Sequence, residues 1–263
     1  MCHDQVMTTW TPESGHVELE RDGAIAILRI ARPDKLNALS IPMLRDLRAA
    51  LAAPGDAAAM VLTGTGRAFS SGDDLVATEA LREDDFTTLM ASFQDLTRVL
   101  LATEIPVIAA LNGIAVGGAA ELALCCDARV GHPGADFLFP ENQVGLTITN
   151  ASSLLLPRLL GSRALPLVLD GERISGTRAH ALGLLDDLVD DPADVVPRAV
   201  AIVRRWVDRG LATRFHLRLL RPPPDAVEAA LAHETAIGLE AWRSGTAHEG
   251  IRRHLADRAA KRR

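Results

Sequence analysis

The central segment, residues 105–126, limits the possible folds most strongly, because it is apolar along its length except for a turn asparagine and one glutamate. Its first part predicts a buried β-strand, and its last part, built from small apolar residues, predicts a buried helix. Gly117 and Gly118 lie where this helix begins, so backbone N–H groups there lack acceptors within the helix. The segment therefore predicts a strand, a glycine turn and a helix inside one core.

Strand and helix patterns alternate through the first two thirds of the chain. Alternating residues around Asp22-Gly23 predict a β-hairpin over residues 16–32, and residues 58–63 predict a short apolar strand. Apolar residues at helical spacing predict an amphipathic helix over residues 86–100. This alternation predicts the α/β fold class.

The last third of the chain has a different character. Arg-rich amphipathic patterns predict long helices over about 194–210 and 224–242, with the sequence RPPP between them as a hinge or cap. We therefore place a boundary near Val195. Residues 1–195 are expected to form the α/β core with the functional site, and residues 196–263 a helical region.

Composition disfavours several classes of partner and location. The 263 residues carry a formal net charge of −6, without the basic excess that nucleic acids and anionic membranes usually require. No apolar run reaches the roughly 18 residues of a membrane span, and the first ten residues lack the features of a secretory signal. The three cysteines, Cys2, Cys125 and Cys126, offer no disulfide framework, so we expect a cytoplasmic protein.

Common cofactor and metal motifs are missing from the sequence. The segment GTGRAF, residues 64–69, lacks the third glycine of a dinucleotide-binding loop, and neither a phosphate-binding loop nor a nucleophile elbow occurs. His233-Glu234 and His248-Glu249 begin like a zinc-protease motif without its second histidine, and we expect these side chains to be solvated. The sequence predicts neither a bound cofactor nor a metal.

Two strand-to-helix turns share one physical design. Residues 68–75 place Gly72 in a polar turn after a strand, and the second turn holds Gly117 and Gly118. Two free amides aimed at one carbonyl oxygen would form an oxyanion hole. Taken separately, each turn is explained as simply by an ordinary glycine turn of an α/β sheet.

Two acidic residues favour the catalytic interpretation. Glu121 lies in the apolar helix, where a carboxylate is costly to bury unless it is used, protonated or paired. Glu141 follows Pro140, which ends a short strand predicted over residues 136–139. Two carboxyl groups beside an oxyanion hole suit proton transfer next to a thioester carbonyl, because the hole stabilises the enolate and an acid with a raised pKa moves the proton.

Three segments resemble the signature segments of the crotonase superfamily, the enoyl-CoA hydratases and isomerases. They are RPDKLNALS, AFSSGDDL and IPVIAALNGIAVGGAAELALCCDARV, and the resemblance extends to HEGIRRHLADR near the C-terminus. It implies a spiral of repeated ββα units with a C-terminal helical region that builds homotrimers, commonly paired into hexamers.

The resemblance also implies roles for four residues. The backbone amides of Asp73 and Gly118 correspond to the oxyanion hole, and Glu121 and Glu141 to the two catalytic glutamates, the latter through the motif FPENQVGL. Glu121 would hold and activate water while Glu141 delivers a proton to Cα, in syn hydration of a trans-2-enoyl-CoA. The implied partner is an acyl-CoA thioester, with coenzyme A as part of the substrate.

Further positions correspond to binding segments for the substrate. Those that resemble the coenzyme A site are Lys35, Leu36, Ala38, Ala68, Ser70 and Gly72. Those that we place in the acyl pocket are Asp74, Leu75, Gly117 and Asn150. Leu36 and Ala38 also have a structural explanation, because they would pack the start of the next helix. A basic C-terminal stretch would approach the coenzyme phosphates or simply be solvated: Arg252, Arg253, Arg258, Lys261, Arg262 and Arg263.

Three positions depart from the family pattern. Asp73 stands where hydratases usually place a small residue, which puts a carboxylate next to the acyl pocket. Residues 146–153 replace a glycine-rich turn, so Asn150 or Ser152 is expected to hydrogen-bond the substrate or Glu141. His254 replaces a phenylalanine that is common near the C-terminus.

Three functions are compatible with these residues. The first is hydration of an enoyl-CoA of unassigned acyl length. The second is isomerisation, in which Glu141 alone moves a proton between Cα and Cγ and Glu121 is a spectator or helper. The third is a non-catalytic relative that serves as an assembly subunit or binding protein, which the presence of both acids and both glycine turns disfavours.

Overall fold

The fold begins with a β-hairpin at the edge of a sheet. A computed structural model describes residues 12–260. Strands β1 (Val17–Asp22) and β2 (Ile25–Ile30) pair antiparallel across a turn in which Gly23 has a φ of 60°. The hairpin predicted around Asp22-Gly23 is confirmed.

Two sheets follow from a repeated pattern of two strands and a helical segment. The larger sheet has the order β1-β2-β3-β5-β7-β9 and the smaller one β4-β6-β8, and all strand pairings after the hairpin are parallel among the residues described. The strands are β3 (Ala59–Gly64), β4 (Ala68–Ser70), β5 (Val107–Ala110), β6 (Ile114–Val116), β7 (Ala128–Gly131), β8 (Phe137–Leu138) and β9 (Asp187–Leu188). Each repeat gives one strand to each sheet, so the expected spiral of ββα units is confirmed.

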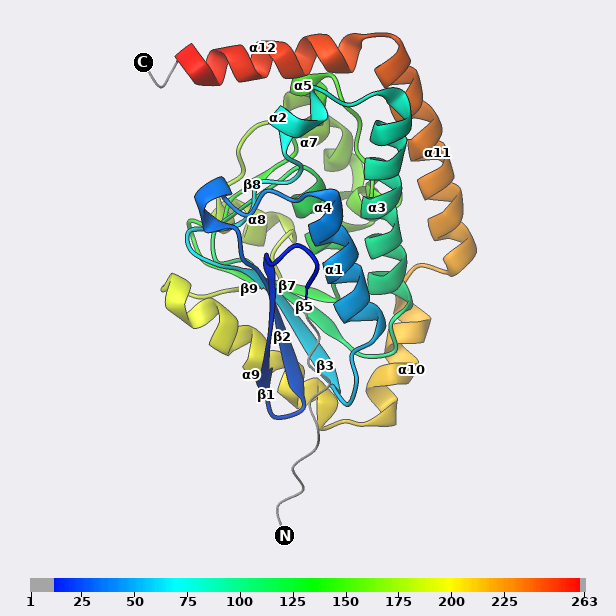
Figure 1. Cartoon of the computed structure of the whole chain (residues 1–263). Helices are drawn as coiled ribbons and strands as arrows, with labels where there is room; N and C mark the ends of the chain where they lie inside the picture. The colour runs from blue at the N-terminus through cyan, green and yellow to red at the C-terminus, as the bar shows by residue number, and fades with distance from the viewer. Residues whose placement is uncertain (1–11, 261–263) are drawn as a thin grey trace.

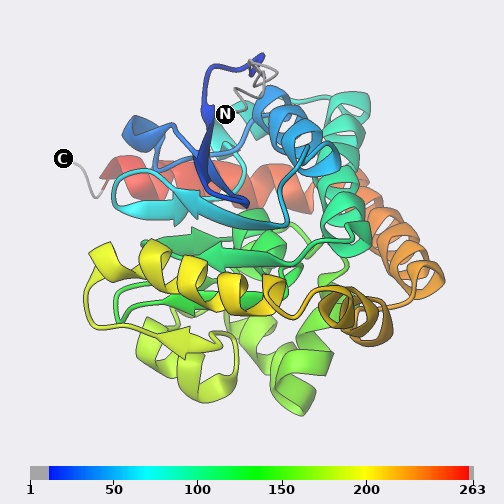
Figure 2. The same cartoon turned by 90° about the horizontal axis from the view of Figure 1, so that it is seen from below.

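Helices cover both faces of the larger sheet. Leu28 and Leu62 point into a cluster with α1 (Ile41–Ala52) and α3 (Glu83–Ala102), while their neighbours Ile27 and Val61 point into a cluster with α9 (Val195–Val207). This alternation is the two-residue period of a strand that is buried on both faces. Figure 2 shows α9, in yellow, lying along the sheet on the side opposite α1.

The C-terminal helices return to the core. They are α10 (Leu211–Leu220), α11 (Pro224–Arg243) and α12 (Thr246–Ala260). In Figure 1, α11 runs beside α3, and α12 crosses over α5 (Glu141–Val144). Trp242 and Ile251 pack there with Phe86 and Met90 of α3.

The sequence patterns do not predict all of these C-terminal helices. They predict neither α10 nor α12, and they place a boundary near Val195, where α9 begins. The side chains of α9 pack against β3, β5 and β7, so this helix contributes to the core although it lies beyond that predicted boundary.

The remaining helices are short. They are α2 (Leu75–Thr78), α4 (Gly118–Leu124), α6 (Ser152–Leu160), α7 (Ala164–Asp170) and α8 (Gly176–Leu182), with 3-10 turns at Pro33–Lys35, Gly161–Arg163 and Pro192–Asp194. Within residues 12–260, no helix is both long and apolar enough to cross a membrane.

Candidate active site

Three turns that follow the three strands of the smaller sheet come together at one place. Residues 71–73 follow β4, Gly117 follows β6, and Pro140-Glu141 follow β8. Because the strands are parallel, their carboxyl ends lie at the same edge of the sheet. The repeat of the fold therefore brings segments distant in sequence to one site.

The contacts between these turns leave no room for larger residues. A Cβ atom on Gly72 would lie 2.4 Å from the carbonyl oxygen of Val116, and Gly72 has a φ of +75°. A Cβ on Gly117, which has a φ of +54°, would lie 3.1 Å from Oε1 of Glu141. Glycine is required at both turns by conformation and by close approach.

A small cavity lies between the turns and α3. Its volume is about 100 Å³. Three carboxyl groups line it, those of Asp73, Glu121 and Glu141, and its other walls are mostly apolar. The apolar lining side chains are Leu75, Phe86, Leu89, Met90, Phe93, Val116, Pro140, Val144 and Leu146. The predicted pocket residues Leu75 and Gly117 do line this cavity.

Two backbone amides beside the cavity are available as donors. Gly118 is the first residue of α4, so its N–H has no acceptor within the helix. Within residues 12–260, neither this N–H nor that of Asp73 donates a hydrogen bond to another protein atom. A Cβ placed on Gly72 would lie 3.5 Å from the Gly118 nitrogen, which shows that the two turns are in contact.

Glu121 is fully enclosed and held by hydrogen bonds. Its side chain is 1% exposed, and both carboxyl oxygens accept from the Thr149 N–H, at 3.2 and 3.1 Å. Asn150 Nδ2 donates to Oε2 at 3.0 Å. Burial, followed by the nearby charges of Glu141 and Glu234, raises the pKa of Glu121 well above its usual value, and the two donors oppose this rise.

Asn150 lies behind Glu121 and not in the cavity. Its amide nitrogen binds Glu121, and its Oδ1 accepts from Thr97 Oγ1 at 2.9 Å. The backbone of Asn150 has a φ of +59°, which its short amide side chain tolerates. The prediction that Asn150 faces the substrate or Glu141 is therefore wrong. Ser152 does not take that role either, because it does not line the cavity and its buried Oγ has no hydrogen-bond partner, Glu141 included, among the described residues.

Glu234 supports the segment that holds Glu121. It is 5% exposed, and it accepts from the backbone N–H groups of Ala151 and Ser153, at 2.9 and 2.8 Å. The prediction that Glu234 is a solvated side chain is wrong. Its position three residues after the buried Leu231 of α11 was the signal that it faces the core.

Glu141 is buried but weakly held. It is 6% exposed, and its Oε2 is buried without a hydrogen-bond partner among the described residues. Burial raises the pKa of Glu141 to about 7, and the charge of Asp73 adds to this effect. A carboxyl group that is protonated near neutral pH can deliver a proton.

Asp73 and Asp74 point in different directions. Asp73 lines the cavity, as expected, and its Oδ2 accepts from Thr78 Oγ1 at 2.8 Å. Asp74 does not line the cavity, and its carboxylate pairs with Arg32 at 3.2 Å. The prediction that Asp74 belongs to the acyl pocket is wrong, because this ion pair holds the side chain on the other side of the turn.

The residues predicted for the coenzyme lie together. The Leu36 carbonyl accepts from the Ser71 N–H at 2.9 Å, and Ser70 Oγ donates to the Asn37 carbonyl at 2.7 Å. These bonds place Lys35, Leu36 and Ala38 beside Ala68, Ser70 and Gly72. Lys35 is exposed, whereas Ala38, Ala68 and Ser70 are buried.

Asn37 was absent from the predicted set although it joins the two segments. Its buried side chain accepts from the Arg32 N–H at 2.9 Å and donates to the Ala68 carbonyl at 2.8 Å. Leu36 and Asn37 both have positive φ, at 52° and 57°. An asparagine in a loop that follows Pro33 was the available signal, because asparagine tolerates this conformation.

The basic C-terminal stretch is only partly described. Arg252, Arg253 and Arg258 are exposed on α12, and Arg253 donates to the Gln143 carbonyl at 3.0 Å. His254 is half-buried on the same helix. Lys261, Arg262 and Arg263 lie outside the described residues, as does Cys2.

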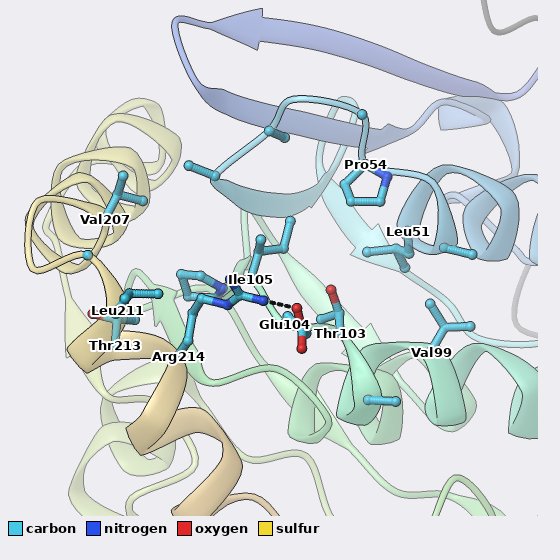
Figure 3. A pocket seen from close by; sticks show the side chains of 17 residues that line it. Leu51, Pro54, Val99, Thr103, Glu104, Ile105, Val207, Leu211, Thr213 and Arg214 are labelled. Atoms are coloured by element: carbon cyan, nitrogen blue, oxygen red, sulfur yellow. Dashed lines mark hydrogen bonds and ion pairs between the residues drawn. The ribbon is translucent and has the colours of Figure 1, made fainter.

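A larger pocket lies elsewhere on the molecule. It has a volume of about 800 Å³ and is lined by Leu51, Ile105, Leu211 and other residues from α1, α3 and the start of α10. Figure 3 shows an ion pair between Arg214 and Glu104 inside it. None of the three carboxyl groups of the small cavity lines this pocket, and among residues 12–260 no group of His, Cys, Asp or Glu side chains is placed to hold a metal.

Comparison with known proteins places the chain in a family. Residues 20–251 match the family model described as enoyl-CoA hydratase/isomerase. A crotonyl-CoA hydratase of Syntrophomonas wolfei is 34% identical over 206 residues, which cover 76% of this chain and 79% of the relative. A probable enoyl-CoA hydratase of Rhodobacter capsulatus is 34% identical over 252 residues, which cover 92% and 95%.

Solved structures agree with this assignment. An enoyl-CoA hydratase/isomerase from Mycobacterium paratuberculosis superposes with a TM-score of 0.83 at 28% identity, covering 90% of this chain and 98% of the other. OdaA of Pseudomonas aeruginosa superposes with a TM-score of 0.82 at 31% identity, covering 91% and 98%. The chain therefore belongs to the enoyl-CoA hydratase/isomerase family, within the crotonase superfamily.

Proposed function

We propose that the protein is an enoyl-CoA hydratase, which adds water across the double bond of a 2-enoyl-CoA thioester. The observation that carries this proposal is the meeting of Glu121 and Glu141 in one cavity, beside the free amides of Asp73 and Gly118. Hydration needs one group to activate water, one to supply a proton and donors for the enolate oxygen. The cavity contains all three.

In the proposed reaction, the thioester oxygen accepts from the amides of Asp73 and Gly118. Glu121 takes a proton from a water molecule while the oxygen of that water bonds to Cβ. The electron pair of the double bond then moves toward the thioester oxygen. The resulting enolate is stabilised by the two amides. As it collapses, Cα takes a proton from Glu141, and the product is a 3-hydroxyacyl-CoA.

The environments of the two glutamates support this division of roles. Burial raises the pKa of both glutamates, that of Glu141 to about 7. The donors Thr149 and Asn150 favour the carboxylate form of Glu121. Glu141 has a buried oxygen without a partner, which favours its neutral form. The proposal therefore assigns the base to Glu121 and the acid to Glu141.

The size of the cavity supports a short acyl group. Pockets for drug-sized ligands measure about 300–1,000 Å³, whereas this cavity measures about 100 Å³. Phe86 and Met90 on one wall pack against Trp242 and Ile251 of the C-terminal helices. These helices would therefore limit the length of the acyl chain.

The remaining features follow the same proposal. The loop of Lys35, Leu36 and Ala38, with Ala68, Ser70 and Gly72, would hold the coenzyme A part of the substrate, and the reaction needs no further cofactor. We infer from the family resemblance a cytoplasmic homotrimer or dimer of trimers. Light scattering coupled to size-exclusion chromatography measures that assembly.

The test is the loss of conjugated-thioester absorbance when purified protein is mixed with crotonyl-CoA. Glu121→Gln and Glu141→Gln serve as matched variants, because each keeps the size of the side chain. The proposal expects rapid loss with the wild type and strong slowing with either variant. An unchanged crotonyl-CoA signal with wild-type protein would contradict hydration of this short substrate.

Isomerisation is the second candidate, and one observation favours it. Glu141 is the only one of the two glutamates with a buried oxygen free of partners among the described residues, as a single proton carrier would need. A 3-enoyl-CoA offered to the same proteins separates the two functions. Conjugation that depends on Glu141 and not on Glu121 would establish isomerisation and exclude the role given to Glu121.

A further inference from the structure

The Asp73 carboxyl group is fixed on the cavity wall with one oxygen unused. Its Oδ2 accepts from Thr78 Oγ1 at 2.8 Å, and Thr78 is itself 2% exposed, so the carboxyl group is held in place. Its Oδ1 is buried and has no hydrogen-bond partner among the described residues. Asp73 lines the same cavity as Glu141, whose Oε2 is also buried and unpartnered.

The proposed hydration does not explain this carboxyl group. Only the backbone amide of Asp73 serves the enolate, and a negative side chain nearby opposes the charge that develops there. A buried acceptor without a donor also costs free energy of folding. Burial raises the pKa of Asp73 to about 6, with the charge of Asp74 adding and the Thr78 hydrogen bond opposing, so the group is mainly ionised above neutral pH.

The position of Asp73 Oδ1 indicates where on a bound substrate a hydrogen-bond donor for it would lie. The side chain and the amide belong to the same residue, so the carboxyl group lies near the reacting carbons of a thioester bound to that amide. The other walls of the cavity are formed mostly by apolar side chains such as Phe86 and Leu89. A polar group on the acyl chain would therefore find its partner close to the double bond and not at the far end.

We propose that Asp73 Oδ1 accepts a hydrogen bond from a hydroxyl group on the acyl chain, so that the enzyme prefers a short enoyl-CoA hydroxylated beside its double bond. This inference rests on the proposed hydratase function. It assigns to Asp73 a specificity role separate from the amide of the same residue. A hydroxyl group would supply the donor that this buried oxygen lacks, whereas an unsubstituted acyl chain would leave it unpaired.

Binding of saturated thioesters tests this inference without turnover. Calorimetry compares butyryl-CoA with 4-hydroxybutyryl-CoA, which differ only in the hydroxyl group. We expect the wild type to bind the hydroxylated thioester about tenfold to a hundredfold more tightly, as for a hydrogen bond to a charged acceptor. In Asp73→Ala, this ratio is expected to approach one, mainly through weaker binding of the hydroxylated ligand.

Two further variants separate specificity from general damage. Thr78→Val frees the Asp73 carboxyl group from its anchor, and we expect a ratio between those of the wild type and Asp73→Ala. Asp74→Asn removes the neighbouring carboxylate, which faces Arg32, and we expect it to keep the wild-type ratio. Thermal unfolding of each variant confirms that it is folded before binding is compared.

These experiments distinguish failure of the specificity role of Asp73 from failure of the proposed hydratase function. Equal wild-type affinity for the two thioesters, or a preference that survives in Asp73→Ala, would overturn the role of Asp73. Failure of the hydratase function would appear separately, as wild-type protein that hydrates neither crotonyl-CoA nor 4-hydroxycrotonyl-CoA. Hydration of crotonyl-CoA with no hydroxyl preference would overturn the inference alone.

Discussion

The two walls of the cavity hold their glutamates in opposite ways. On the α4 side, Glu121 accepts hydrogen bonds from Thr149 and Asn150, and that segment is in turn held by Glu234 of α11. On the α5 side, Glu141 has a buried oxygen without a partner and faces the charge of Asp73. One carboxyl group is oriented by its surroundings, whereas the other is only enclosed by them.

We infer from this difference that Glu121 serves as the base of the cavity and Glu141 as its acid. Donors stabilise the charged form of a carboxyl group, and burial without donors stabilises the neutral form. The unpaired oxygen of Glu141 is costly for folding, as expected where a residue is retained for its chemistry and not for stability. Four experiments test whether the two walls differ in this way.

The largest expected effect is on turnover. Glu121→Gln and Glu141→Gln are each expected to lower kcat for hydration by about 10²–10⁴-fold, the range for loss of a positioned acid or base. The KM for the thioester should change much less, because the segments that we propose to hold coenzyme A include neither glutamate. Steady-state kinetics with crotonyl-CoA measures both constants. A variant with more than half of the wild-type kcat would show that its glutamate is a spectator.

The second largest expected effect is on the free energy of unfolding, which should depend on pH because of Glu141. The folded protein holds the Glu141 proton, because burial raises the pKa of Glu141 from 4.5 to about 7, whereas the unfolded chain releases it near pH 4.5. The folded state binds more protons between these values, so its stability falls as pH rises through that window, and the penalty is complete above about pH 7. Glu141→Gln should remove this penalty and gain on the order of 3 kcal/mol at alkaline pH.

Chemical unfolding at several pH values measures this gain. The gain should disappear toward pH 4.5, where the carboxyl group is protonated in both states. Glu228→Gln is the matched control, because Glu228 is exposed and pairs with Arg98 at 2.7 Å. The control should show no alkaline gain. If Glu141→Gln were equally destabilised at every pH, the buried acid would be better satisfied than its contacts indicate.

Removal of Asn150, which orients Glu121, is expected to have a smaller effect on stability and on kcat. Asn150→Gly keeps a residue that tolerates the φ of +59° while it removes the bonds to Glu121 and Thr97. The free energy of unfolding should fall by about 1–3 kcal/mol, the cost of leaving a buried partner unsatisfied. The kcat should fall up to about a hundredfold through misplacement of Glu121, with little change in KM. A wild-type kcat in a folded Asn150→Gly protein would show that Asn150 does not position Glu121.

The smallest expected effect is on the shape of the pH dependence of kcat/KM. Above about pH 7, Glu141 should lose the proton that it delivers to Cα, so kcat/KM should fall about tenfold per pH unit. At lower pH, protonation of Glu121, whose pKa burial raises, should lower kcat/KM again. In Glu141→Gln, the acidic limb of the residual activity should move to lower pH, because the charge of Glu141 no longer raises the pKa of Glu121. A wild-type profile that is flat through the neutral range would contradict these roles of the two glutamates.

The sequence predicted the parts of this architecture that depend on local pattern. The strand, glycine turn and helix around Gly118 were predictable because apolar runs and glycine turns are local signals. Glu121 and Glu141 were recognisable as candidate functional residues because burial of a carboxyl group in an apolar segment costs free energy. Family resemblance added the pairing of the two turns, which no local pattern encodes.

The direction of individual side chains was not predictable. Asp73 and Asp74 are identical neighbours, and their contacts with Thr78 and with the distant Arg32 decide which of them faces the cavity. The role of Asn150 was not predictable either, because its hydrogen-bond partner Glu121 lies 29 residues earlier in the chain. Glu234 lies even farther along the chain from the segment it supports. Such contacts depend on tertiary packing, and the residues involved carry no local signal for their partner.

The most direct test of the central claim is the fate of the oxygen of water. Crotonyl-CoA is incubated with the protein in water enriched in heavy oxygen, and the product is analysed by mass spectrometry with Glu121→Gln alongside. The account predicts a 3-hydroxyacyl-CoA that has gained one water and carries one heavy oxygen on Cβ, formed far more slowly by the variant. Crotonyl-CoA recovered without added water, or a product in which heavy oxygen is absent from Cβ, would contradict it.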